Sequence, residues 1–312
     1  MLPCGGENDG TPKPQDVGDT HRKAGRTVFS KAARGFGKTA IWAVGRLATH
    51  RSSRLPNTKE MTIMSNIPIL VARLVFGKLL PRLAYPVIFG PLRGARFVLG
   101  TLSGECGGVS VYFNAVEPQQ TSALVNTLNR GQVFFDIGAN VGYYSILASR
   151  LVGMQGSVIA IEPVIRNLFQ LYKHTILNKA NNVTILPAAC ADSLSLSAFS
   201  SGINYSEGHL VGENANKGKG FRNVVSVVPT VTVDAVVKEL DVFPDVIKID
   251  VEGAEYLVLK GARATLLRAR PRIFLSVHSE SLRSTCLEYL EVFGYTFEEL
   301  APSEFLAKHT EP

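Results

Sequence analysis

Cysteine is scarce in this chain of 312 residues, and its four copies lie far apart in the sequence, at Cys4, Cys106, Cys190 and Cys286. No C-x-x-C pair occurs, so the sequence gives no support for a zinc site or for a disulfide framework. We expect the thiols to be small buried residues. The same scarcity is typical of proteins from reducing compartments, and it predicts a cytoplasmic protein.

Long apolar runs are also lacking. Arg73, Lys78 and Arg82 interrupt the apolar segment 61–100 well short of the roughly 18–20 residues that a membrane-spanning helix needs. We therefore expect no transmembrane helix. Two alternatives remain for this segment, namely peripheral contact with a membrane surface and a helix near 67–76 that packs on the main domain, and the second is favoured.

Acidic residues are absent from 20–59, which carry ten Lys or Arg. Residues 1–104 hold 16 basic and 5 acidic side chains (+11), whereas residues 105–312 hold 17 and 21 (−4), which together give the net charge of +7. A transit peptide, a nucleic-acid arm or a membrane-surface segment would each fit 20–59. Another alternative is that translation starts at Met61 or Met64. We expect 1–60 to be a disordered or weakly structured basic extension.

Strand-like and helix-like segments alternate after residue 130. This alternation predicts βαβ units and hence an α/β fold with a doubly wound, mostly parallel sheet covered by helices on both faces. We assign 61–130 to an N-terminal helical segment that packs on the core, 131–300 to the main domain and 301–312 to a tail. The expected strands are 132–137, 157–162, 182–187, 224–229, 245–250, 271–277 and 295–300, and the expected helices are 142–152, 164–178, 233–240, 254–268 and 280–293.

One long polar stretch, 192–223, interrupts the alternation and is rich in Ser, Gly and Asn. Insertions of this length are usually either disordered surface loops or covers over a binding site. Both alternatives stay open for this stretch.

The turn from Asp136 to Gly142 follows an apolar strand and leads into a helix, so backbone N–H groups and a helix N-terminus should face a ligand there. Its two glycines, Gly138 and Gly142, would let that ligand approach closely. A dinucleotide fingerprint would require glycine at Asn140 and Tyr143, so a nicotinamide dinucleotide fits less well. Asp136 suits a ligand with a positive part, such as the amino acid end of S-adenosylmethionine. The alternative is a turn whose glycines serve only tight packing.

Three further ionisable residues end predicted strands, namely Glu162, Asp250 and His278. Because carboxyl ends of parallel strands meet at one edge of the sheet, we expect these side chains near the glycine turn. Glu162 could accept hydrogen bonds from both ribose hydroxyls, and Lys248 could pair with one of the acids near Asp250. His278 could be a general base near neutral pH, although a lone histidine is more often structural.

The other histidines give no further site. His174 is expected on the surface of its helix, and no two histidines have the spacing of metal ligands. The sequence therefore predicts no set of metal ligands, and a divalent metal ion that assists at Asp250 stays an open alternative.

The sequence resembles the FkbM family of S-adenosylmethionine-dependent methyltransferases in three segments: 135–144, Ile161–Pro163 and Ile247–Glu255. The resemblance implies a class I (Rossmann-like) methyltransferase domain, whose seven-stranded sheet has an antiparallel final strand. It also implies that S-adenosylmethionine is the cofactor. By this likeness Asp136, Gly138, Asn140 and Gly142 would bind the methionine part, Glu162 the ribose, and the segment ending at Asp192 would lie near the adenine.

The expected activity is methyl transfer to a hydroxyl group of a sugar, polyketide or similar small-molecule or glycan acceptor. Asp250 and His278 are the candidate catalytic residues, in positioning or base roles. The alternatives are a non-catalytic cofactor-binding module and, less favoured, an NAD-dependent dehydrogenase. We expect no nucleic-acid partner, and the sequence predicts neither the particular acceptor nor the oligomeric state.

Overall fold

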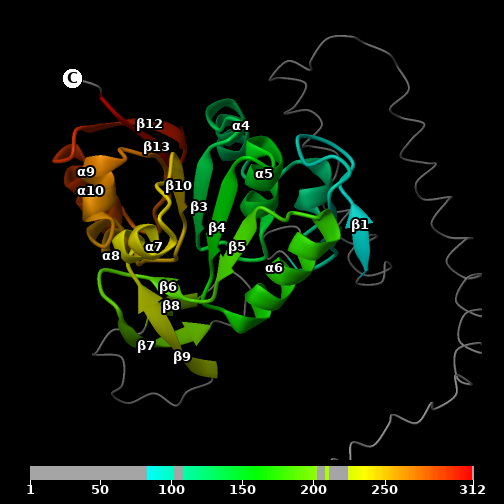
Figure 1. Cartoon of the computed structure of the whole chain (residues 1–312), viewed down its shortest axis with the longest axis horizontal. Helices are drawn as coiled ribbons and strands as arrows, with labels where there is room; N and C mark the ends of the chain where they lie inside the picture. Colours follow the sequence, from blue (N-terminus) through cyan, green and yellow to red (C-terminus); the bar gives the residue numbers. More distant parts are fainter. Residues whose placement is uncertain (1–82, 102–107, 202–207, 211–223, 311–312) are drawn as a thin grey trace, which may run out of the picture. The chain divides into compact units, whose positions relative to one another are not determined.

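The computed structural model describes residues 83–101, 108–201, 208–210 and 224–310 (Figure 1). The expected basic extension, the expected helix near 67–76, Cys4 and Cys106 lie outside these ranges. Within them, Cys190 and Cys286 are free and buried, as predicted. No helix in the same ranges is long and apolar enough to cross a membrane.

The main sheet has seven strands in the order β12-β13-β11-β10-β3-β4-β5. Neighbouring strands are parallel except around β13, which runs antiparallel to both β11 and β12. The predicted doubly wound, mostly parallel sheet with an antiparallel final strand is therefore confirmed. The strands are β3 (Val133–Ile137), β4 (Ser157–Ile161), β5 (Val183–Leu186), β10 (Val246–Ile249), β11 (Arg272–Ser276), β12 (Tyr295–Ala301) and β13 (Glu304–His309).

The helices follow the predicted alternation closely, with one exception. The helix expected over 254–268 is interrupted at Gly261, where a Cβ would overlap with the carbonyl oxygen of Ala191. The helices are α4 (Pro118–Thr127), α5 (Tyr143–Val152), α6 (Ile165–Asn178), α7 (Val233–Leu240), α8 (Glu255–Lys260), α9 (Arg263–Arg268) and α10 (Glu280–Glu291).

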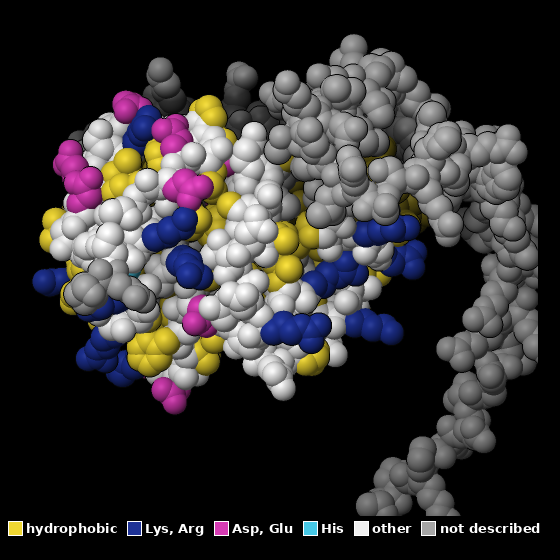
Figure 2. Space-filling model, turned by 90° about the horizontal axis from the view of Figure 1, so that it is seen from above, with side chains coloured by type: hydrophobic (Ala, Val, Ile, Leu, Met, Phe, Trp, Pro, Cys, Tyr) yellow, Lys and Arg dark blue, Asp and Glu magenta, His cyan; other side chains and the backbone are white. Residues whose placement is uncertain are grey.

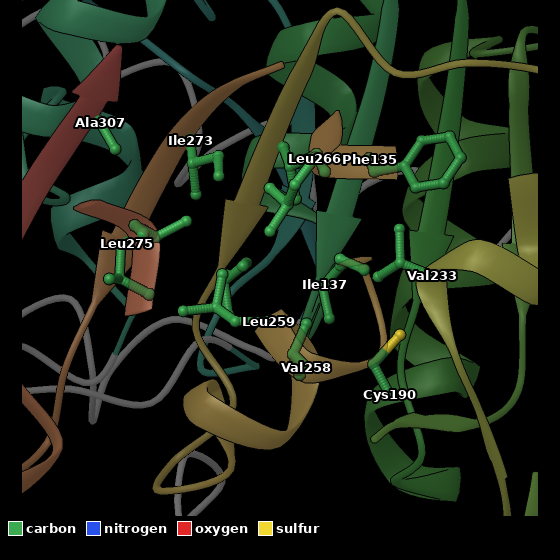
Figure 3. Packing of buried hydrophobic residues seen from close by; sticks show 14 of the residues in the cluster. Phe135, Ile137, Cys190, Val233, Val258, Leu259, Leu266, Ile273, Leu275 and Ala307 are labelled. Atoms are coloured by element: carbon green, nitrogen blue, oxygen red, sulfur yellow. The ribbon is translucent and has the colours of Figure 1, made fainter. Parts of the chain in front are cut away.

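Alternating strand residues build two separate clusters of buried side chains, one on each face of the sheet. Phe135 and Ile273 pack in the first cluster with side chains from α7 to α10 (Figure 3). Phe134 and Phe274 pack in the second cluster with α4, α5 and the N-terminal segment. Figure 1 accordingly shows α7 to α10 on one side of the sheet and α4 to α6 on the other. This period of two is what an extended strand buried on both faces requires.

Two sequence assignments need correction, namely the expected tail after residue 300 and the sheet to which the strand expected at 224–229 belongs. Residues 304–309, expected in a tail, form β13, because their alternating apolar side chains Phe305 and Ala307 complete the first cluster. The strand expected at 224–229 is β9 (Val224–Val231), which lies in a second sheet of order β6-β9-β7-β8. That sheet also contains β6 (Ala189–Cys190), β7 (Ser195–Ser201) and β8 (Gly208–Leu210), so the polar stretch 192–223 is partly strand.

The described part of the N-terminal segment is not simply helical. It contains an antiparallel pair, β1 (Ala84–Pro86) and β2 (Arg96–Val98), followed by the 3-10 helix η2 (Ser110–Phe113) and by α4. Phe97 and neighbouring apolar residues pack in the second cluster, on the core. Figure 2 shows basic, acidic and apolar side chains intermixed on one face of the described residues. Membrane contact through 61–100 and the lack of a nucleic-acid partner remain predictions.

Candidate active site

The glycine turn between β3 and α5 has the backbone geometry that its sequence predicts. Gly138, Asn140 and Gly142 have positive φ angles of 82°, 50° and 90°. A Cβ on Gly138 would overlap with the carbonyl oxygen of Asp250, and one on Gly142 would collide with Leu171. In the part of the chain that the structure describes, both glycines are needed because other residues of the protein pack closely against them. This agrees with the alternative that the glycines serve tight packing.

Glu162 connects the turn to the end of β4. Its carboxylate is buried and accepts hydrogen bonds from the backbone N–H groups of Asn140 (2.8 Å) and Val164 (2.9 Å) and from the Asn167 amide (3.2 Å). Burial raises the pKa of Glu162 to about 7, against the opposing effect of these hydrogen bonds. The residue therefore fixes the turn and also changes its charge near neutral pH.

A row of charged side chains crosses the sheet at the carboxyl ends of its central strands. Asp136 on β3 lies opposite Lys248 on β10, and both are almost completely buried. The Lys248 ammonium lies 2.8 Å from the Asp250 carboxylate, as expected from the sequence. Although burial disfavours its charge, the carboxylates of Asp250, Glu117 and Asp136 raise the pKa of Lys248. Lys248 is therefore the cation that holds these acids together.

Asp136 itself is less accessible than its predicted contact with a cofactor suggests. Its side chain is 1% exposed and accepts a hydrogen bond from the Ser145 hydroxyl on α5. Burial raises the pKa of Asp136, against the effects of Lys248 and Ser145. This carboxylate thus connects β3, to which it belongs, with α5 through Ser145 and with β10 through Lys248.

His278 follows β11 and lies among three carboxylates. Its Nδ1 is 2.7 Å from Glu255 Oε1, and its Nε2 is 3.3 Å from Glu252 Oε2 and 3.6 Å from Asp250 Oδ1. The hydrogen bond with Glu255, aided by Glu252 and Asp250, raises the pKa of His278 to about 9 against the effect of burial. While only carboxylates surround it, the imidazole is protonated near neutral pH and is not ready to accept a proton.

The structure adds three side chains that the sequence analysis did not select. Glu117 precedes α4 with a φ of 36° and accepts a hydrogen bond from the Tyr144 hydroxyl (2.7 Å). The Tyr144 ring lies 4.6 Å from the Lys248 ammonium. Glu304 on β13 lies opposite Ser276, and burial raises its pKa to about 7, with Glu117 and Asp250 adding to the effect. The only sequence signal was an acid before Pro118, at the start of a helix.

Asp192 and His174 lie outside the row of charged side chains. Asp192 follows β6, and its carboxylate pairs with Lys260 on α8 at 2.6 Å, which lowers the pKa of Asp192. Its role near adenine stays a prediction. His174, expected on the surface, is instead completely buried. It lies 2.7 Å from the Val141 carbonyl oxygen in the turn and accepts a hydrogen bond from Val98 N–H on β2.

Comparison with known families identifies the domain. The methyltransferase FkbM domain matches residues 136–299, which is more than half of the chain. This chain belongs to the FkbM methyltransferase family. The FkbM domain has the class I methyltransferase fold and uses S-adenosylmethionine as its methyl donor, so the dehydrogenase alternative is excluded.

Three solved structures with similar folds illustrate how distant such relatives can be in sequence. Methyltransferase FkbM from Methylobacillus flagellatus KT is 17% identical with a TM-score of 0.42, and the match covers 67% of this chain but only 56% of that one. The ribosomal protein L11 methylase of Lactobacillus delbrueckii subsp. bulgaricus is 12% identical (TM-score 0.45; 72% and 91% covered). Fibrillarin of Aeropyrum pernix, solved with natively bound S-adenosyl-L-methionine, is 12% identical (TM-score 0.38; 58% and 68% covered). Comparison with curated proteins gives no match.

The residues of the turn fit this donor in the FkbM domain. The Oδ1 atom of Asn140 is buried without a hydrogen-bond partner, and such an orphaned acceptor is suited to a donor group on a ligand. Glu162 Oε2 accepts one described hydrogen bond, from Asn140, so a lone pair remains for a ribose hydroxyl. The contacts of Asp136, Gly138, Asn140, Gly142 and Glu162 with the donor stay predictions.

The pKa of Glu162 predicts how donor binding depends on pH. If the ionised carboxylate binds the ribose hydroxyls, affinity for S-adenosylhomocysteine should be constant above about pH 7.5. Below the pKa of about 7, protonation should weaken binding by up to about tenfold per pH unit. Titration calorimetry between pH 5.5 and 8.5 measures this dependence. Glu162→Gln should bind weakly at every pH, and an unchanged slope in that variant would assign the titration to another group.

Proposed function

We propose that this FkbM methyltransferase methylates a hydroxyl group of a sugar, polyketide or similar small-molecule or glycan acceptor. The supporting observation is the concentration of ionisable side chains where β10, β11 and β13 meet: Asp250, His278 and Glu304, with Glu117 nearby. Such groups can hydrogen-bond the hydroxyls of a polyol, whereas an apolar acceptor would offer them no hydrogen bond.

The roles of the side chains follow from the reaction geometry. Methyl transfer is an in-line displacement, so the acceptor oxygen must be held about 3 Å from the methyl carbon. S-adenosylmethionine, when bound, supplies the electrophilic methyl group. Asp250, oriented by Lys248, accepts the hydrogen bond of the acceptor hydroxyl and takes up its proton as the methyl group is transferred, which leaves S-adenosylhomocysteine. His278, which is protonated while it contacts only carboxylates, positions Asp250 and the acceptor.

The acceptor class can be tested with a donor that carries a deuterated methyl group. The purified chain should label hydroxyl-bearing sugars or polyketides, and matched analogues that lack the hydroxyl should stay unlabelled in mass spectrometry. Asp250→Asn should lower kcat by about 10²-fold or more while it retains S-adenosylhomocysteine binding. Glu298→Gln, which alters an exposed ion pair with Lys308, is the control.

Two results would contradict the proposal. Labelling of amines in place of hydroxyls would overturn the acceptor class. Donor binding without transfer to any acceptor would favour the non-catalytic cofactor-binding module.

A further inference from the structure

The end of β10 and the end of β11 bring together one imidazole and two carboxylates. Asp250, Glu252 and His278 each offer one ligand atom, and these atoms lie within 4.8 Å of one another. The sequence predicted that Asp250 and His278 share one edge of the sheet, but it did not predict Glu252 as a third ligand beside them.

The distances within this cluster suit ligands of a single ion. The Nε2 atom of His278 is 3.3 Å from Glu252 Oε2 and 3.6 Å from Asp250 Oδ1. Metal bonds to imidazole nitrogen and carboxylate oxygen are about 2.0–2.2 Å long, which places neighbouring ligand atoms roughly 3 to 3.5 Å apart. The two separations that involve His278 therefore match those of neighbouring ligands around one small divalent ion.

Glu255 provides a second, independent observation. This residue begins α8 and is completely buried, and its Oε1 lies 2.7 Å from His278 Nδ1. A carboxylate behind the histidine fixes the ring so that Nε2 faces the ligand position, as in many metal sites. The Oε2 atom of Glu255 is buried and has no hydrogen-bond partner. The positive charge next to this carboxylate is the imidazole of His278, which also contacts Asp250 and Glu252.

The charges around the cluster point the same way. Asp250, Glu252 and Glu255 all lie around His278, so carboxylates face both nitrogens of its imidazole. Lys248 contacts Asp250 from the side of the sheet. A divalent ion between Asp250 and Glu252 would take the place of the proton on Nε2.

We propose that Asp250, Glu252 and His278 bind a divalent cation, and that the cation holds the acceptor hydroxyl at an open coordination position. Mixed imidazole and carboxylate ligands suit Mn²⁺ or Zn²⁺ better than Ca²⁺, which prefers oxygen ligands alone. The orienting role of the cation rests on the proposed hydroxyl acceptor. The binding of the cation itself does not depend on the nature of the acceptor.

Binding is tested on the full chain with Mn²⁺ as the probe, by electron paramagnetic resonance and titration calorimetry, with Mg²⁺ and Zn²⁺ as competitors. We expect one Mn²⁺ per chain and at least about a tenfold loss of affinity in Glu252→Gln. Glu280→Gln is the matched control, because Glu280 is a strongly exposed acid only two residues from His278. No Mn²⁺ binding, or equal affinity in the two variants, would overturn the site. Retained S-adenosylhomocysteine binding shows that the variants are folded.

The orienting role has a separate readout. Removal of cations with a chelator should lower methyl transfer to the hydroxyl acceptor, and added Mn²⁺ should restore it. Transfer that is insensitive to the chelator would overturn the role of the cation and leave the proposed acceptor intact. Mn²⁺ binding that depends on Glu252 would support the site even if no hydroxyl were methylated, in which case the acceptor assignment would fail alone.

Discussion

Replacement of Gly138 by alanine should abolish measurable S-adenosylhomocysteine binding and destabilise the domain by roughly 2–5 kcal/mol, from positive-φ strain and overpacking together. The new Cβ would overlap with the carbonyl oxygen of Asp250 at a φ of 82°. Neither segment can easily move away. Gly138 N–H donates to the Ile161 carbonyl, and Asp250 N–H donates to the Ile137 carbonyl. Calorimetry and urea unfolding measure the two effects.

Gly131 offers a matched control for this substitution. Its φ of 83° is nearly the same, but a Cβ there would meet no atom within 4 Å. Gly131→Ala should therefore cost only the conformational strain, about 1–2 kcal/mol, and should leave cofactor binding unchanged. Equal effects of the two alanines would mean that the contact with Asp250 is unimportant and that backbone strain alone matters.

Lys248→Met should be the most destabilising change in the charged row, at about 3–5 kcal/mol. Methionine removes the ammonium group but fills a similar volume. The carboxylates of Asp136 and Asp250 would then lose their shared cation in a region where Lys248 and Asp136 are almost completely buried. Urea unfolding at pH 7 measures the loss, and methyl transfer should fall because Asp250 is no longer held in place.

The exposed pair of Lys308 and Glu298 shows what the same substitution costs without burial. Their charged atoms are 2.7 Å apart, and both side chains are about half exposed. Lys308→Met should change the free energy of unfolding by less than about 1 kcal/mol. A similarly small effect at Lys248 would show that the buried acids take up protons when the ammonium group is removed.

Local sequence patterns predicted the central part of this domain well. Buried parallel strands read as short apolar runs, so the ends of β3, β4, β10 and β11 could be located within one or two residues. Because such ends share one edge of the sheet, Asp250 and His278 were expected at the same edge, and their side chains lie 3.6 Å apart there. The cost of burying charge indicated that Lys248 pairs with one of the nearby acids, and the structure identifies this acid as Asp250.

Features that depend on long-range pairing were not predictable in this way. No strand was predicted at β13, and only its insertion between β11 and β12 makes Glu304 part of the site. Glu117 reaches Lys248 through the packing of α4 over the sheet, which no local pattern encodes. His174 was expected on the surface because α6 is polar in sequence. It is buried instead, and its hydrogen bonds involve β2 and the glycine turn.

The position of β13 bears on how this protein can be divided for expression. A fragment limited to the family match, 136–299, would lack most of β3 and all of β13, so β12 would lose its neighbour and β11 one of its two. It would also lack Phe97 and the other N-terminal side chains that cover the second cluster. The limits of family similarity are thus not the limits of folding. The shortest fragment that we expect to fold must extend from before β1 to the end of β13.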